Sequence, residues 1–333
     1  MDPTQQLQAM ATGFRVSSAL SVAAELGLSD LLHAGPRTLA DLAEATGSHE
    51  PTLRRLMRGL VAAGVYAEES EGTYTNTALG DCLRDDLPGT VRPLARTLQD
   101  PALWSAWGHL GHSVATGENA FQALHGVDVW THRQGHPEAN VIFNDNMTAL
   151  SSMVAEAVAE TYDFSGFSSI VDVGGGKGIL LETVLARHPQ LTGTVFDLAH
   201  VVADGPSDTA DPSVAARFTT ASGSFFEAVP PGDVYLLKSI LHDWPDERCQ
   251  DILRTCRRAL TPDGVVLVIE TLIGRPGFEM ESAFSDLNML VLPGGQERTD
   301  DEYASLFQAA GLMLTRSIDT DTRFSIVEAR AAS

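Results

Sequence analysis

The segment that most constrains the fold of this chain is Ser168–Gly178, with the sequence SSIVDVGGGKG. Its β-branched residues are too few for a helix and stop at a run of glycines, which predicts a short strand followed by a tight turn. Glycine lacks a Cβ atom, so such a turn can adopt unusual backbone angles and let a ligand lie against it. Apolar residues then recur at helical spacing from Ile179. A strand, a glycine turn and a helix are therefore expected, an arrangement in which α/β folds bind cofactors.

Two acidic residues accompany this turn. Asp172 lies just ahead of the glycines, and Asp197 ends the next apolar run, where an acid can reach the hydroxyls of a ribose. The glycine pattern is G-x-G-x-G and lies in the middle of the chain, whereas a dinucleotide fold usually carries G-x-G-x-x-G near the start of its domain. We therefore expect a cofactor without a pyrophosphate, S-adenosylmethionine.

Composition narrows the classes of partner. The chain has 333 residues, of which 44% are apolar and 20% are charged, enough for two domains and a sizeable core. Asp and Glu number 44 against 22 Lys and Arg, a formal charge of -22 that repels phosphate backbones, so no nucleic acid is expected as a partner. The three scattered cysteines predict neither a disulfide framework nor a zinc site. A polar N-terminus and the lack of a long apolar run predict a cytoplasmic protein with no membrane partner.

Residues 1–100 have the pattern of a winged helix. A helical stretch over 4–34 is followed by two short helices, near 38–47 and 51–63, and by a hairpin up to residue 75. This pattern raises the possibility of DNA binding, in which three arginines of the second short helix would face phosphates: Arg54, Arg55 and Arg58. The acidity of the segment favours the alternative, a helical packing and dimerisation module.

The rest of the chain divides into two parts. Residues 101–162 are expected to form a helical linker rich in aromatic side chains. These side chains either pack in a core or form a wall for an aromatic substrate. Residues 163–333 alternate short β runs with helices, the signature of a doubly wound parallel sheet. Strands are expected at 168–173, 193–197, 217–221, 233–239, 264–270, 312–319 and 324–330, the last two as an antiparallel hairpin at the sheet edge. Helices are expected at 178–188, 246–260, 283–291 and 299–310.

Three side chains predict acid–base chemistry, two of them at the carboxyl edge of this sheet. His242 follows the fourth strand, Glu270 ends the fifth, and Glu297 lies in a loop before a helix capped by Thr299. A carboxylate beside a histidine fixes its tautomer and raises its basicity, as a general base requires. The structural alternatives are a histidine that caps or packs a turn and a Glu297 that pairs with Arg298 or caps a helix.

Several motifs occur together in the order DVGGGKG, FDLAHV, GSFF, LLKSILHDWPDERC and PGGQERT. In this order the chain resembles the plant caffeic-acid and microbial polyketide-type O-methyltransferases over nearly its whole length. The resemblance implies a class I methyltransferase, a Rossmann-like α/β fold with an N-terminal winged-helix dimerisation domain. It implies a homodimer, independent of metal, that transfers a methyl group from S-adenosylmethionine to a hydroxyl of an aromatic small molecule, as in antibiotic and other secondary metabolism. His242 would be the general base, with Glu270 and Glu297 flanking it.

The resemblance also implies two sets of binding residues. The cofactor set is Asp172, Gly174, Gly176, Asp197, Leu198, Ser224, Phe225 and Lys238, with the glycines at the methionine end, Asp197 at the ribose, and Ser224 and Phe225 at the adenine. The substrate set, a looser match, is Trp104, Phe143, Asn144, Met147, Asp243, Asn288 and Met289. The plant enzymes usually have Asp at position 224 and Pro at position 199, where this chain has Ser and Ala.

Three other functions are open at this point. A relative with the same cofactor could catalyse hydroxylation, decarboxylation or a pericyclic step, but the presence of His242 and both glutamates favours methyl transfer. A winged-helix regulator could bind DNA, and a metal-assisted methyltransferase could recruit Asp172, Asp197 and Asp243.

Overall fold

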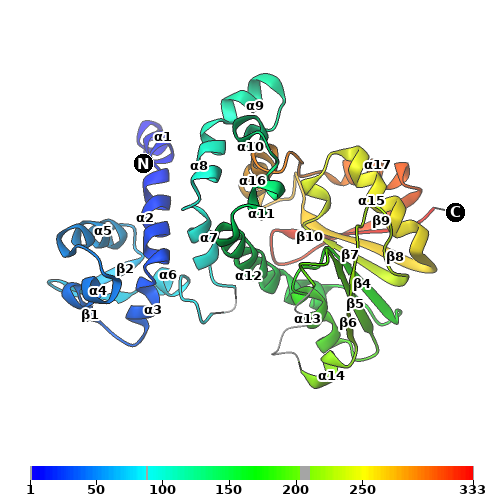
Figure 1. Cartoon of the computed structure of the whole chain (residues 1–333), viewed down its shortest axis with the longest axis horizontal. Helices are drawn as coiled ribbons and strands as arrows, with labels where there is room; N and C mark the ends of the chain where they lie inside the picture. The colour runs from blue at the N-terminus through cyan, green and yellow to red at the C-terminus, as the bar shows by residue number, and fades with distance from the viewer. Residues whose placement is uncertain (1, 88, 203–210, 333) are drawn as a thin grey trace. The chain divides into compact units, whose positions relative to one another are not determined.

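The computed structural model describes residues 2–87, 89–202 and 211–332 (Figure 1). The chain divides into two compact units. The first comprises Met1–Gly108 and Thr131–Leu150, and the second comprises His109–Trp130 and Ser151–Ser333. The helices of segment 101–162 are thus shared between the two units.

The first unit begins with helices and a small sheet. Its elements up to the hairpin are α1 (Pro3–Ala11), α2 (Phe14–Glu25), α3 (Leu28–His33), β1 (Arg37–Thr38), α4 (Leu39–Thr46), α5 (Glu50–Ala62), β2 (Tyr66–Ser70) and β3 (Thr73–Asn76). The strands are antiparallel in the order β1-β3-β2, so the predicted winged-helix pattern is confirmed. The expected single helix over 4–34 is wrong, because the chain forms three helices there. Gly27 takes a left-handed conformation, with φ of 62°, that ends the path of α2.

Short helices follow in the first unit: α6 (Ala78–Asp81), α7 (Arg92–Thr97) and α8 (Pro101–Gly108). Residues of helices α2, α3, α4 and α5 and of the hairpin form the core of this unit. Leu28, Met57 and Tyr66 are fully buried in it. Two further helices, α11 (Val129–Gln134) and α12 (Pro137–Thr161), begin in one unit and end in the other.

The second unit is built on a seven-stranded sheet (Figure 1). Its strands are β4 (Ser169–Val173), β5 (Thr192–Asp197), β6 (Phe218–Ser222), β7 (Gly232–Lys238), β8 (Leu260–Thr271), β9 (Leu312–Asp319) and β10 (Phe324–Ala331), in the order β6-β5-β4-β7-β8-β10-β9. The first five are parallel, and the terminal hairpin is antiparallel at the edge, as predicted. The one long difference is β8, which begins at Leu260 rather than at residue 264. A register shift between Gly232 and Val234 accommodates the additional residues.

The helices of this unit are α9 (Leu110–Thr116), α10 (Ala120–His125), α13 (Ile179–Arg187), α14 (Pro212–Ala215), α15 (Asp246–Ala259), α16 (Glu279–Val291) and α17 (Asp300–Ala309), with a 3₁₀ turn, η1, at Leu241–Asp243. On one face of the sheet, buried residues of α15 and α17 and alternate residues of β4, β7, β8 and β10 form one apolar cluster. α13 packs against β4 and β5. Within the described ranges, no helix combines the length and the apolarity needed to cross a membrane.

The strand order reverses beside β4. The chain passes from β4 through β5 to β6 on one side and then returns to β7 on the other. In open α/β sheets the carboxyl ends of the strands at such a switch point form the ligand crevice. The glycine turn after β4 and the histidine turn after β7 therefore meet at the edge where a ligand is expected.

Candidate active site

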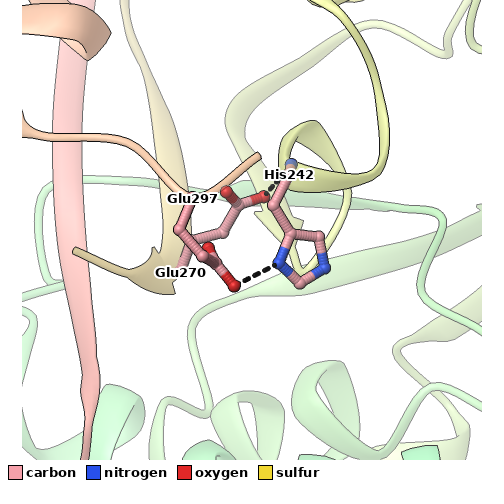
Figure 2. A group of neighbouring side chains, drawn as sticks. All are labelled: His242, Glu270 and Glu297. Atoms are coloured by element: carbon pink, nitrogen blue, oxygen red, sulfur yellow. Dashed lines mark hydrogen bonds and ion pairs between the residues drawn. The ribbon is translucent and has the colours of Figure 1, made fainter. Parts of the chain in front are cut away.

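His242 lies in η1 and contacts Glu297 through its ring. The Nδ1 atom is 3.0 Å from Oε1 of Glu297, whose side chain is 1% exposed, while the imidazole is 14% exposed. Figure 2 shows the carboxylate of Glu297 pointing at the ring. Ser285 of α16 donates its hydroxyl to the same Oε1 at 2.6 Å, which fixes the carboxylate. In the neutral imidazole, an Nδ1–H bonded in this way leaves the lone pair on Nε2.

The charges around the imidazole set its pKa. Burial alone would lower the pKa of His242, since it disfavours the charged ring. Asp243, with Oδ1 3.6 Å from Nε2, opposes this, as does Glu297. Glu270 adds a third negative charge, and the net effect raises the pKa of His242 from 6.5 to about 10.

Glu270 lies beside His242 but binds the backbone and not the ring. Its Oε1 accepts the N–H groups of Ile240, Leu241 and His242 at 3.0, 2.7 and 3.1 Å. Tyr303 of α17 donates its hydroxyl to the other oxygen, Oε2. Figure 2 shows this carboxylate reaching the backbone nitrogen of His242. Both glutamates thus flank the histidine as expected, but they contact different groups.

Arg298 holds the same turn from its carbonyl side. Its guanidinium is fully buried and donates to the carbonyl oxygens of Leu241 and Trp244 at 3.1 and 2.9 Å. It pairs with Asp246 at 2.8 Å, so the alternative in which Arg298 pairs with Glu297 is wrong. Thr299 caps α17 as predicted, in a capping box with Glu302.

Gly295 allows the loop before α17 to touch the histidine turn. A Cβ atom built on Gly295 would fall 1.9 Å from the carbonyl oxygen of His242, so no side chain fits there. The neighbouring N–H of Gln296 donates to that same carbonyl at 2.9 Å. The PGGQERT segment therefore positions both Glu297 and the backbone of His242.

The glycine turn is closely packed at Gly174 and Gly175 and open at Gly176. A Cβ atom on Gly174 would lie 2.4 Å from Cδ1 of Ile240, and one on Gly175 would lie 2.6 Å from the carboxyl group of Asp172. Gly176 has a φ of 58° and nothing within 4 Å of the position of a Cβ atom. The turn can therefore bring bare backbone to a ligand.

Asp172, which is buried, and Lys238, which is half-buried, interact through their opposite charges near this turn. Burial raises the pKa of Asp172 to about 7 although Lys238 opposes the shift, and burial lowers the pKa of Lys238 although Asp172 opposes it. Oδ2 of Asp172 is buried without a hydrogen-bond partner among the described residues. A buried carboxylate oxygen left in this way fits a ligand that carries hydrogen-bond donors.

The remaining predicted cofactor residues follow β5 and β6. Asp197 accepts the N–H of Gly176 at 2.9 Å and that of Leu198 at 2.7 Å, one on each carboxylate oxygen, which leaves lone pairs for further donors. Leu198 is half exposed. Ser224 accepts the N–H of Phe226 at 3.3 Å, and Phe225 meets Trp244 edge to face.

The predicted substrate residues fall in both units. Asp243, Asn288 and Met289 belong to the second unit, and Met289 is buried in α16. The others belong to the first unit: Trp104, Phe143, Asn144 and Met147. Trp104 lines a surface groove of about 530 Å³ together with residues of α2, and the guanidinium of Arg133 lies 3.5 Å from the ring centre of Phe143.

One group of side chains has spacing that could suit a metal ion. Within the described parts of the chain, His242, Glu270 and Glu297 bring one ligand atom each within 4.8 Å of one another. However, three backbone N–H groups occupy Oε1 of Glu270, and the ring and Ser285 occupy Oε1 of Glu297. Both Oε1 atoms are therefore committed to hydrogen bonds, and Oε2 of Glu297 is buried without a hydrogen-bond partner among the described residues. The contacts that are present fit an oriented base better than a metal centre.

Sequence reasoning missed Tyr303, Ser285 and Gly295. Tyr303 and Ser285 lie on helices whose apolar periodicity gives no sign that one polar group faces a carboxylate. Gly295 carried a signal, because two successive glycines before a helix indicate a close backbone approach.

Comparison with known proteins agrees with this geometry. Residues 107–313 match a family model described as the O-methyltransferase domain, and residues 8–86 match the O-methyltransferase dimerisation domain, which favours dimerisation over DNA binding. The chain is 39% identical over 322 residues to a phenazine O-methyltransferase of Lysobacter antibioticus, covering 96% of this chain and 94% of the relative.

Two solved structures extend the comparison. The crystal structure of LaPhzM superposes with a TM-score of 0.94 at 38% identity, covering 99% of this chain and 100% of that one. An O-methyltransferase of neocarzinostatin biosynthesis, NcsB1, in complex with S-adenosyl-L-homocysteine and 1,4-dihydroxy-2-naphthoic acid, gives 0.80 at 34% identity, covering 95% and 96%. The chain thus belongs to the S-adenosylmethionine-dependent O-methyltransferase family that its motifs predicted.

Proposed function

We propose that this enzyme transfers a methyl group from S-adenosylmethionine to a hydroxyl of an aromatic small molecule, with His242 as general base. The observation that carries the proposal is the 3.0 Å contact between Nδ1 of His242 and Glu297. It directs the ring proton to Nδ1 and leaves Nε2 to take a proton from an acceptor hydroxyl. The names of relatives support an aromatic acceptor: one is a phenazine O-methyltransferase, and NcsB1 is in complex with 1,4-dihydroxy-2-naphthoic acid.

The glycine turn and its neighbours suit S-adenosylmethionine. Gly174 and Gly176 would bring backbone to the methionine end, and the unpartnered oxygen of Asp172 suits its donors. Asp197 keeps lone pairs for a ribose, while the half-buried Lys238 interacts electrostatically with Asp172. When bound, S-adenosylmethionine supplies an electrophilic methyl carbon on a sulfonium. The adenine contacts of Ser224 and Phe225, the cofactor contact of Leu198 and the contacts of the predicted substrate residues remain predictions.

His242 contributes by accepting the hydroxyl proton on Nε2 when its ring is neutral. The carboxylates around the ring raise its pKa to about 10, and the positive charge of a bound donor would lower that pKa, since a nearby like charge disfavours the charged ring. A phenol has a pKa of about 10, so few molecules are ionised at neutral pH. General-base assistance is worth roughly 10²- to 10⁴-fold. Alignment of the reacting atoms contributes on the order of 7 to 11 kcal/mol in favourable cases, so positioning outweighs proton removal. Glu297 holds the imidazole in the required tautomer.

We also propose that the enzyme works as a homodimer. The support is the match of residues 8–86 to the dimerisation domain, together with exposed apolar side chains on the first two helices, among them Leu7, Met10 and Phe14. Sedimentation equilibrium tests this: a mass of one chain at micromolar concentration would contradict it.

The direct test incubates the enzyme with methyl-labelled S-adenosylmethionine, a panel of phenols and hydroxylated polycyclic aromatics, and a chelator. We expect label in an O-methyl product of at least one acceptor. A His242→Gln variant should bind the donor normally in calorimetry and transfer roughly 10²- to 10⁴-fold more slowly. No transfer to any acceptor, or transfer that the chelator abolishes, would contradict the proposal.

A further inference from the structure

The turn that carries His242 is held by charged side chains rather than by a regular ladder of backbone bonds. The N–H groups of Ile240, Leu241 and His242 point at one oxygen of Glu270. The turn also follows a strained residue, since Ser239 has a φ of 54° without being glycine. Such a backbone persists only where the surroundings fix it. The position of the imidazole therefore depends on where the carboxylate of Glu270 is held.

Tyr303 is the side chain that holds the second oxygen of Glu270. Both residues are fully buried, and the tyrosine hydroxyl donates to Oε2. The three backbone bonds all go to Oε1, so Tyr303 supplies the hydrogen bond that the other side of the carboxylate needs. Burial, with the negative charge of Glu270 next, raises the pKa of Tyr303 well above its usual range, so the hydroxyl keeps its proton and remains a donor.

We propose that Tyr303 is a positioning residue for methyl transfer and acts on His242 through Glu270. Glu270 then anchors the backbone of the histidine turn, while Glu297 orients the ring, so the two glutamates have different tasks. The chain of contact runs from α17 through the end of β8 to η1, within the second unit. This inference rests on the proposed function of His242.

The test is a double-mutant cycle of Tyr303→Phe and Glu270→Gln, with Tyr235→Phe as matched control. Tyr235 is another fully buried tyrosine of the same apolar cluster, and its hydroxyl donates to the carbonyl of Pro230 on a different loop. We expect Tyr303→Phe to lower kcat roughly tenfold, with both KM values within twofold of the wild type. In the Glu270→Gln background the same change should alter kcat less than twofold. Tyr235→Phe should leave kcat within twofold even where it lowers Tm.

A second readout does not depend on turnover. The ring resonances of His242 in a ¹³C-histidine spectrum should shift in Tyr303→Phe and not in Tyr235→Phe. A wild-type kcat in Tyr303→Phe, an equal loss of kcat in both backgrounds, or an unchanged His242 resonance would overturn the inference. A wild-type enzyme that methylates no acceptor would instead contradict the proposed function, which keeps the two failures distinct.

Discussion

Neutralising Glu297 should lower the pKa of His242 by a measurable amount. Glu297→Gln keeps the size of the side chain, and its amide oxygen can still accept from Nδ1 and from Ser285. It removes one of three carboxylates that raise the ring pKa to about 10. An opposite charge within 4 to 6 Å shifts a pKa by roughly 1 to 3 units, or about 1.4 to 4 kcal/mol. We therefore expect the ring of the variant to titrate roughly 1 to 3 units lower.

The assay is a pH titration of ¹³C-labelled histidine in the unliganded enzyme. The chain has ten histidines, so the His242 resonance is assigned as the one missing from His242→Gln. Glu118→Gln is the control, because it removes a carboxylate 3.1 Å from the ring of His112, far along the chain. An unchanged pKa of His242 in Glu297→Gln would refute the electrostatic account of this site. An equal shift of the His242 pKa in Glu118→Gln would refute it as well.

The same pKa has a consequence for stability, with a definite sign. The folded pKa of His242 lies above the unfolded value of 6.5, so the charged ring stabilises the fold fully below pH 6.5. That contribution is lost as the pH rises to about 10. In Glu297→Gln the folded pKa is lower, so the loss should be complete at a lower pH.

Three further predictions concern the site and the fold of the second unit. Gly295→Ala should reduce kcat at least tenfold, because the added Cβ would fall 1.9 Å from the carbonyl oxygen of His242. Near-normal kinetics would refute the role of this loop in positioning His242. Burial alone would raise the pKa of Asp233, but hydrogen bonds that include the N–H and hydroxyl of Ser168 lower it to about 2. Asp233→Asn should therefore cost roughly 1 to 2 kcal/mol of stability at pH 7, measured by urea unfolding. That difference should shrink as the pH falls from 4 toward 2, and a constant difference would count against it. Leu253→Ala should destabilise by about 2 to 5 kcal/mol in the same assay, because Leu253 is fully buried in the core of the second unit, and a cost under 1 kcal/mol would contradict that packing.

The sheet could be predicted because its signals are local. Each strand of the second unit is a short apolar run bounded by turn residues, and each helix has an apolar stripe. The exception, the start of β8, lies at Leu260–Gly264, where Pro262 and Gly264 have the composition of a turn. Pairing with β7 extends the strand across these turn-forming residues, because contacts with a neighbouring strand can outweigh the local preference of the sequence.

The residues of the site could be predicted from the sequence better than the contacts between them. Glu297 lies in a loop that is compatible with the carboxyl edge, and the position of His242 and Glu270 at that edge follows from parallel topology. Which glutamate touches the ring does not, because it depends on side-chain directions that sequence spacing leaves open. Arg298 illustrates this, since its nearest acid in the sequence is Glu297, yet the folded chain pairs it with Asp246.

The position of His242 at the methyl donor is tested most directly by comparing two ligands that differ in one charge. S-adenosylmethionine carries a sulfonium, and S-adenosyl-L-homocysteine carries a neutral thioether. A cation near the imidazole disfavours its charged form, so saturation with S-adenosylmethionine should lower the ring pKa of His242 by roughly 1 to 3 units relative to the homocysteine complex. Equal ring pKa values in the two complexes would contradict a catalytic imidazole at the site of methyl transfer.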